Sequence, residues 1–341
     1  MTTEAKEKAT ETQAADNSAG GPEARGGSFV ARIKEAGEIL SLLAALVLLC
    51  IVFAIASPYF LNIKNILNVL SNTAILGIMA AGLFVAMLLG AMDVSQYAVV
   101  AFSTSIVALA ARSGMNTLVV IIFGLLVAVA CGAFNGFAVA FMKISPIITT
   151  LGTMAIFRGF AYLLTQSRTL MVTGNFFQVI GRGRFLGIPL PIYIMAVVFI
   201  LIHVMLKYTA FGRKVFAVGG NPRASYLSGI NIKMIRFFGL IVSAATAGIA
   251  GITFVSQVGA AMPNAGEAAL MDVITAVILG GISLSGGKGR LIGTLIGVLI
   301  LAVLQNGMVL LGVQSFYQMM IRGAVIIIAV FLDTVRGGGF K

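Results

Sequence analysis

The sequence predicts an all-α polytopic membrane protein with about ten transmembrane helices. Of its 341 residues, 59% are hydrophobic and only 10% are charged, and the mean hydropathy is +1.05. A soluble domain of this length could not bury so much apolar surface, so lipid has to cover it. Apolar runs close to the ~20 residues that cross the hydrocarbon core lie near 39–57, 66–90, 95–111, 117–142, 146–166, 190–206, 236–258, 270–284, 291–311 and 316–333.

Residues 1–34 differ from the rest of the chain and predict a disordered N-terminal tail. Residues 1–28 carry five acids and three bases among Ala, Thr and Gly, a composition that cannot form a core. They lack the basic start, apolar middle and small-residue cleavage site of a signal peptide, so we expect the first span to remain in the mature protein. Residues 35–336 then form the membrane domain, which contains a long polar loop at 207–236.

The distribution of positive charge predicts the orientation of the spans. With the N-terminus inside, 16 of the 23 Lys and Arg residues fall in inner segments, five in outer segments and two within spans. Short cytoplasmic loops carry such an excess of cations. We therefore expect both termini and the 207–236 loop to face the cytoplasm. The net charge of +12 is spread singly between apolar runs, which argues against nucleic acid as a partner.

Two pairs of short segments suggest an internal duplication. Phe157-Arg158-Gly159 in the fifth span resembles Ile321-Arg322-Gly323 in the tenth, as two five-span halves in inverted orientation would require. Residues 89–95 also resemble 279–285, but at a different offset. A five-plus-five inverted repeat is therefore one interpretation that the sequence leaves open.

Few side chains are available for chemistry in the membrane domain. An enzyme needs acids, bases or nucleophiles that converge on one site. After residue 38 the acids are Asp93, Glu267, Asp272 and Asp333, and the one histidine is His203. Residues 283–289 lack the first Gly and the final Ser or Thr of a phosphate-binding loop, so we interpret them as a tight turn. We expect no catalytic residue, no metal site and no cofactor.

Ionisable side chains at membrane depth usually face the bundle interior or a wet pathway. The ionisable candidates for lining or gating such a pathway are Asp93 and Arg158, and Ser95 and Gln96 are polar candidates next to Asp93. For Asp93 the alternative role is a cap that binds backbone amides at the start of the third span. For Arg158 and Arg322 the alternative is that the side chain extends to the outer interface.

The 207–236 loop carries start and stop signals for one short helix. Asn221 is a good N-cap, Pro222 suits the first helical position, and Gly229 can provide the left-handed exit. About two turns of helix would then present Tyr226, Leu227 and Ile230 as apolar contacts among cations, a surface suited to a soluble partner. Two stretches of the sequence also resemble signatures of bacterial ABC-importer permeases for monosaccharides, in the ribose-permease-like branch. The first comprises residues 211–213 and 217–231, and the second comprises residues 276–289 and 293–297.

This resemblance covers residues 40–336 and implies a permease subunit that translocates a carbohydrate across the bacterial inner membrane. It implies as partners a second permease subunit in a homo- or heterodimer, two cytoplasmic ATP-binding subunits and an extracytoplasmic sugar-binding protein. The ATPase-coupling residues that it implies are Phe211, Gly212, Arg213, Gly219, Gly220, Asn221, Pro222, Arg223, Ala224, Ser225, Tyr226, Leu227, Gly229 and Ile230.

One departure from the family pattern bears on the substrate. After the second span the family commonly has Gly-Ile-Asp-Leu-Ser-Val-Gly-Ser, and this chain keeps Asp93 and Ser95 but places Gln96 and Tyr97 where smaller groups stand. The change would suit a sugar other than ribose. The alternatives are a permease for nucleosides or branched-chain amino acids, and a secondary transporter, which would need buried acids for a coupling ion.

Overall fold

The computed structural model describes residues 23–172, 175–267 and 269–336, and the chain divides into two units, residues 1–43 and 44–341. The predicted disordered tail lies partly outside the described residues, which begin at residue 23. Residues 23–34 form the first turns of helix α2 (Glu23–Ala56), so this stretch differs from the predicted disorder. Extending a helix that is already nucleated costs little, and residues 31–36 are mostly good helix formers.

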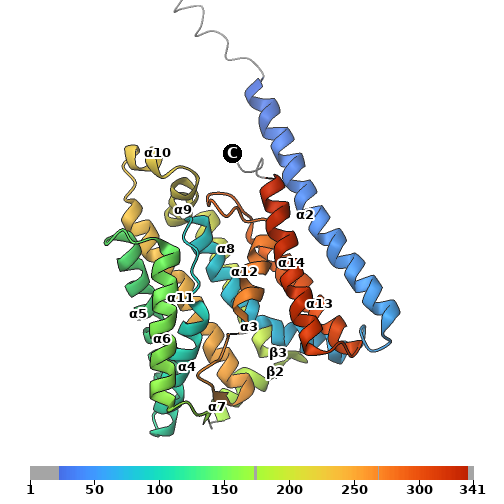
Figure 1. Ribbon diagram of the computed structural model, residues 1–341, viewed down its shortest axis with the longest axis vertical. Helices are drawn as coiled ribbons and strands as arrows, with labels where there is room; N and C mark the ends of the chain where they lie inside the picture. The colour runs from blue at the N-terminus through green and yellow to red at the C-terminus, as the bar shows by residue number, and fades with distance from the viewer. Residues whose placement is uncertain (1–22, 173–174, 268, 337–341) are drawn as a thin grey trace, which may run out of the picture. The chain divides into compact units, whose positions relative to one another are not determined.

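The second unit is built from helices joined by short connections. After α2 they are α3 (Ile63–Leu88), α4 (Gln96–Arg112), α5 (Thr117–Ala140), α6 (Pro146–Thr165), α7 (Asn175–Arg182), α8 (Leu190–Tyr208), α9 (Ala210–Gly220), α10 (Pro222–Leu227), α11 (Ile232–Val258), α12 (Ala269–Leu279), α13 (Leu291–Leu310) and α14 (Ser315–Arg336). The helices α9 and α10 lie at one end of the bundle, and α7 lies at the opposite end (Figure 1).

Four two-residue strands form two small antiparallel pairs. Strand β1 (Leu170–Met171) pairs with β4 (Ala260–Ala261), with Leu170 opposite Ala261. Strand β2 (Arg184–Phe185) pairs with β3 (Ile188–Pro189), with Arg184 opposite Pro189. The β1–β4 pair joins the connection after α6 to the connection after α11, which are far apart in the sequence.

Each of the ten predicted spans contains a helix, and the all-α polytopic fold is confirmed. Seven helices in the described part of the chain are long and apolar enough to cross a membrane, namely α2 (from Ile39), α3, α5, α6, α8, α11 and α13. Shorter apolar helices correspond to the other three predictions: α4, α12 and the first part of α14. At 1.5 Å per residue, the 11 residues of α12 cover about half of the ~30 Å hydrocarbon thickness.

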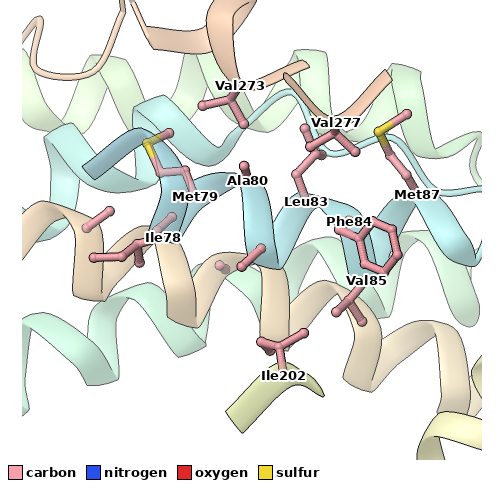
Figure 2. Packing of buried hydrophobic residues seen from close by; sticks show 14 of the residues in the cluster. Ile78, Met79, Ala80, Leu83, Phe84, Val85, Met87, Ile202, Val273 and Val277 are labelled. Carbon is pink, nitrogen blue, oxygen red and sulfur yellow. The ribbon is translucent and has the colours of Figure 1, made fainter. Parts of the chain in front are cut away.

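Helix α3 forms the centre of the hydrophobic core. Every residue from Gly77 to Leu88 is buried, as expected for a helix that is apolar on all sides. Its side chains meet Val273 and Val277 of α12 on one side and Ile202 of α8 on another (Figure 2). The same helix also packs along α11 and α13.

Small residues let α11 approach its neighbours closely. A Cβ added at Gly82 of α3 would lie 3.2 Å from the Cα of Ser243. On α5, a Cβ at Gly132 would lie 2.8 Å from the Cα of Ile241, and one at Gly136 would lie 2.8 Å from the carbonyl oxygen of Phe237. Backbones at this separation gain van der Waals contact, which drives helix association in lipid.

The helix boundaries support the inverted repeat. The sequence separation between the starts of α3 (Ile63) and α11 (Ile232) equals the separation between the starts of α6 (Pro146) and α14 (Ser315). The counterparts α3 and α11 are antiparallel, because Gly82 lies beside Ser243 while Gly239 lies beside Leu89. The two halves therefore run in opposite directions.

The second sequence match paired segments that are not equivalent. Residues 89–95 precede α4, whereas residues 279–285 come at the end of α12 and after it. In the repeat, the counterpart of the 89–95 connection is the stretch between β4 and α12. This explains why the two offsets in the sequence disagreed.

The close approach of α5 and α11 predicts that the same Gly-to-Ala substitution lowers stability at one helical glycine and not at another. Gly132→Ala should lower the apparent Tm of the detergent-purified chain, because overpacking a tight contact costs about 1–3 kcal/mol. Gly152→Ala in α6 is the control, since a Cβ there meets nothing within 4 Å. Size-exclusion chromatography after heating measures both variants, and an equal Tm for the two would contradict the packing argument.

Candidate functional site

Asp93 sits in a buried polar cluster between α3, α4, α5 and α11. One carboxylate oxygen accepts from the backbone N–H of Ser95 at 3.0 Å and from its hydroxyl at 2.6 Å. The other oxygen accepts from the hydroxyl of Ser243 at 2.7 Å. Asp93, Ser95 and Ser243 have no exposed surface. The carboxylate thus bridges the start of α4 to the middle of α11.

Two amide side chains complete this cluster. Asn135 of α5 donates to the hydroxyl of Ser95 at 2.8 Å. Gln96 donates to the hydroxyl of Ser243 at 2.9 Å and to the carbonyl oxygen of Met79 at 3.2 Å. Each serine hydroxyl therefore accepts one bond from an amide and donates one to Asp93. The amide oxygens of Gln96 and Asn135 have no partner in the described part of the chain.

The cluster fixes the point at which α4 begins. Because Gln96 bonds to Met79, well before the end of α3, the connection at 89–95 runs back into the bundle and α4 starts inside it. Irregular backbone at membrane depth is tolerated only where protein or a wet cavity covers it. Asp93 accepts one backbone N–H just before α4, that of Ser95, and its other two bonds come from serine hydroxyls. Ser243 and Asn135 were missed from the sequence, although each is a polar residue within an apolar run.

A separate cavity of about 560 Å³ opens between α3, α12, α13 and α14. Its wall is largely apolar, but Asn72, Asn264 and Gln305 also line it. These three side chains are exposed and make no hydrogen bond within the described residues. Ala269, the first residue of α12, also lines the cavity, so the positive end of this helix adjoins it. None of Asp93, Ser95, Gln96 and Arg158 reaches this cavity.

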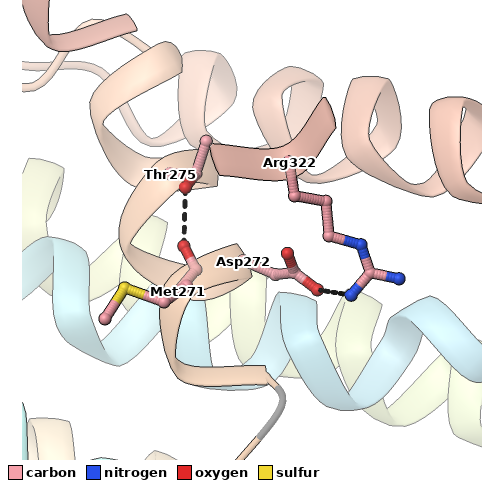
Figure 3. A network of polar contacts seen from close by, with 4 residues as sticks. All are labelled: Met271, Asp272, Thr275 and Arg322. Carbon is pink, nitrogen blue, oxygen red and sulfur yellow. Dashed lines mark hydrogen bonds and ion pairs between the residues drawn. The ribbon is translucent and has the colours of Figure 1, made fainter. Parts of the chain in front are cut away.

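An ion pair forms one wall of this cavity. Arg322 of α14 donates to Asp272 of α12 at 3.1 Å (Figure 3). The side chain of Asp272 is 11% exposed and that of Arg322 is 25% exposed. Arg322 therefore points toward α12 and does not extend away from the bundle. The hydroxyl of Thr275 donates to the carbonyl oxygen of Met271 one turn away.

Arg158 belongs to a second, more exposed ion pair. Its guanidinium donates to Glu267 at 3.0 Å and lies over the ring of Tyr162, 5.6 Å from the centroid. The structure therefore does not bring Arg158 together with the Asp93 cluster. Instead, Arg158 holds the connection that leads into α12, in which Asn264 faces the cavity. In the described part of the chain, no three His, Cys, Asp or Glu side chains are grouped to hold a metal ion.

At the end of the bundle that carries α9 and α10, the predicted short helix is present. Asn221 caps α10 by accepting from the N–H of Ala224 at 2.9 Å, Pro222 is its first residue, and Gly229 has φ +77°. Tyr226 is 71% exposed and Leu227 is 80% exposed. Ile230 differs from the expectation, because it is half-buried against the core.

The other predicted coupling residues lie partly on α9, a helix that the sequence analysis missed. Thr209 caps it by accepting from the N–H of Gly212 at 3.2 Å. Residues 283–289 form a turn, as predicted, and the N–H of Gly287 donates to the carbonyl oxygen of Leu88 at 2.8 Å. A Cβ at Gly219 would collide with that same carbonyl oxygen. The end of α3, α9 and this turn are therefore locked together.

Comparison with known proteins decides the family. The model of the permease components of branched-chain amino acid transport systems matches residues 65–330. The chain belongs to this family. No solved structure gives a significant match.

The permease is similar to several sugar transport proteins. It is 42% identical over 290 residues to the ribose import permease protein of Bacillus subtilis, covering 84% of this chain and 90% of the relative. It is 39% identical over 303 residues to the ribose import permease of Escherichia coli K12, covering 88% and 94%. The L-arabinose ABC transporter permease of Azospirillum brasilense is 34% identical over 279 residues, covering 82% of each.

The hydrogen bonds of Asp93 predict a graded response to substitution. Asp93→Ala leaves three buried donors without an acceptor, at about 1–3 kcal/mol each, and should sharply lower the apparent Tm of the permease. Asp93→Asn keeps the acceptor for Ser95 and loses only the bond from Ser243, so it should lower the Tm slightly and keep most solute uptake. An Asp93→Asn permease that is stable but inactive would instead show a direct role for the charge.

Proposed function

We propose that the permease carries a carbohydrate, a monosaccharide such as ribose, across the inner membrane as a subunit of an ABC importer. Support comes from relatives named for ribose import and for the transport of L-arabinose and D-allose. The observation that carries the proposal is the cavity lined by Asn72, Asn264 and Gln305. Free carboxamides offer both donors and acceptors, which match sugar hydroxyls.

The cavity suits a neutral polyol better than an amino acid. Its volume of about 560 Å³ falls within the usual range for small-molecule sites. A zwitterion would need an unpaired carboxylate and an unpaired cation, whereas Asp272 and Arg322 already neutralise each other. The family description names branched-chain amino acids, so this solute class is the alternative to be tested.

The predicted pathway residues would act on this cavity from a distance. We propose that Asp93, Ser95 and Gln96 position α4, whose Val100 lines the cavity. Arg158 would gate access through Glu267, because their ion pair holds the connection that carries Asn264. The four residues are then positioning or gating groups that do not contact the sugar.

Uptake by cells tests both the solute and the cavity. Deletion of the gene in the source organism should abolish uptake of one labelled sugar among ribose, arabinose and allose, and leave leucine uptake intact. In a complemented strain, Asn264→Leu or Gln305→Leu should lower uptake about two- to tenfold, the value of one lost hydrogen bond.

Gln178→Leu on α7 is the matched control, because Gln178 is exposed and does not line the cavity. Loss of leucine uptake in the deletion strain would assign the branched-chain amino acid function instead. Normal sugar uptake by both cavity variants would place the sugar route elsewhere.

We propose further that α9 and α10 dock one of two cytoplasmic ATP-binding subunits, with both termini on that side of the membrane. The exposed Tyr226 and Leu227 supply apolar contacts, and Arg213 and Arg223 are exposed cations on the same two helices. A second permease subunit and an extracytoplasmic sugar-binding protein would complete the importer. Energy would come from the ATP-binding subunits.

The docking proposal predicts that Leu227→Asp abolishes co-purification of the ATP-binding subunit while membrane insertion persists. Interfaces draw most of their energy from a few buried side chains, and Leu227 is too exposed to support the fold. Ala224→Glu should act similarly, and Arg223→Ala should be milder.

The matched control is Leu186→Asp, since Leu186 is 83% exposed and lies between β2 and β3, away from α10. Retention of the ATP-binding subunit and of uptake by Leu227→Asp would exclude α10 as the docking surface.

A further inference from the structure

A second cavity, of about 410 Å³, lies where the end of α5 and the starts of α6 and α11 meet. Three cations line it, Lys143, Lys233 and Arg236. No acid is among the described residues that line it, and none of the three cations pairs with a carboxylate in the described chain. The Nε atom of Arg236 is buried without a hydrogen-bond partner. The cavity thus concentrates uncompensated positive charge.

Backbone donors add to this charge. Ser145 precedes α6 without a side-chain cap bond, so first-turn N–H groups of this 20-residue helix are left without a cap. Ser145 and Pro146 both line the cavity. Together with the three cations, this helix end favours an anion.

The backbone at Lys143 is held in an unfavourable conformation. Its φ is +60°, in the left-handed region, where a non-glycine residue is strained. The turn itself is fixed by bonds from Met142 to Phe137 and from Ile144 to Ala138. Glycine would serve this turn better, so the local geometry does not explain the lysine. Its ammonium group is exposed and pairs with no carboxylate in the described residues, so it is available to a ligand.

The surroundings of the cavity distinguish a lipid from a soluble anion. Exposed apolar side chains continue from it along all three helices, among them Phe137 and Phe141 at the end of α5, Ile147 and Ile148 on α6, and Phe238 on α11. A soluble ion would make no contact with this apolar surface, whereas the acyl chains of a lipid would cover it. Basic pockets between helices at a membrane surface bind anionic headgroups in this way.

We propose that this cavity binds the phosphate headgroup of an anionic phospholipid, with Lys143, Lys233 and Arg236 as its cationic partners and the adjoining apolar faces as the acyl-chain surface.

Native mass spectrometry of the delipidated full-length chain tests the proposal. The chain is mixed with equal amounts of phosphatidylglycerol and phosphatidylcholine that carry the same acyl chains. The wild type should prefer phosphatidylglycerol by more than tenfold, since each cation contributes about fivefold. Lys143→Gly should lose about fivefold of that preference while it folds normally, because glycine suits the left-handed turn.

The triple variant Lys143→Gly, Lys233→Gln, Arg236→Gln should show no preference. A matched control removes three cations elsewhere, with Arg112→Gln, Arg168→Gln and Arg184→Gln, and should behave as the wild type. Equal binding of both lipids by the wild type, or a preference that survives in the triple variant, would overturn the proposal. Displacement of phosphatidylglycerol by equimolar glycerol 1-phosphate would also overturn it, because the site would then bind a soluble phosphate.

Discussion

A backbone that leaves helical geometry within a bilayer finds no water to bond with, and each unpaired group costs several kcal/mol. Within the described residues, the backbone of the permease leaves helical geometry inside the bundle at two places, after α3 (residues 89–95) and at residues 262–267. At the first break, Asp93 accepts from the N–H of Ser95 and holds the connection against α11 through Ser243. At the second, a Cβ placed on Gly266 would lie 3.5 Å from the Cα of Tyr97, so α4 covers the connection. Each break is thus protected by the other half of the repeat.

Such cover is available only because the helices approach one another closely. Gly82, Gly132 and Gly136 let α11 lie against both α3 and α5, and this places Ser243 within 2.7 Å of Asp93. A larger side chain at any of the three would separate the backbones and pull the polar partners apart. Packing and hydrogen bonding therefore support each other in this bundle, where lipid provides no hydrophobic force between helices.

The sequence predicted the features that depend on neighbouring residues. Apolar runs located the helices, and the cap and exit residues of α10 located that helix, because length and capping are local properties. The partners of Asp93 were not predictable in this way, since Ser243 lies 150 residues away and becomes a neighbour only through the close packing of α11. The cavity lined by Asn72, Asn264 and Gln305 was not predictable for the same reason, because these residues come from three different segments that only the packed fold brings together. Helix α9 was missed because its glycines and cations resemble a loop.

Helix α3 connects the two ends at which function is proposed. Its first half contributes Val69, Asn72 and Thr73 to the cavity proposed for the sugar. The carbonyl oxygen of its last residue, Leu88, accepts from the N–H of Gly287, which abuts Gly219 of α9. Between these ends the helix is buried on all sides, so it cannot bend without opening the core. In the importer proposed above, a displacement of α9 would move α3 as a rigid body and so reshape the cavity wall.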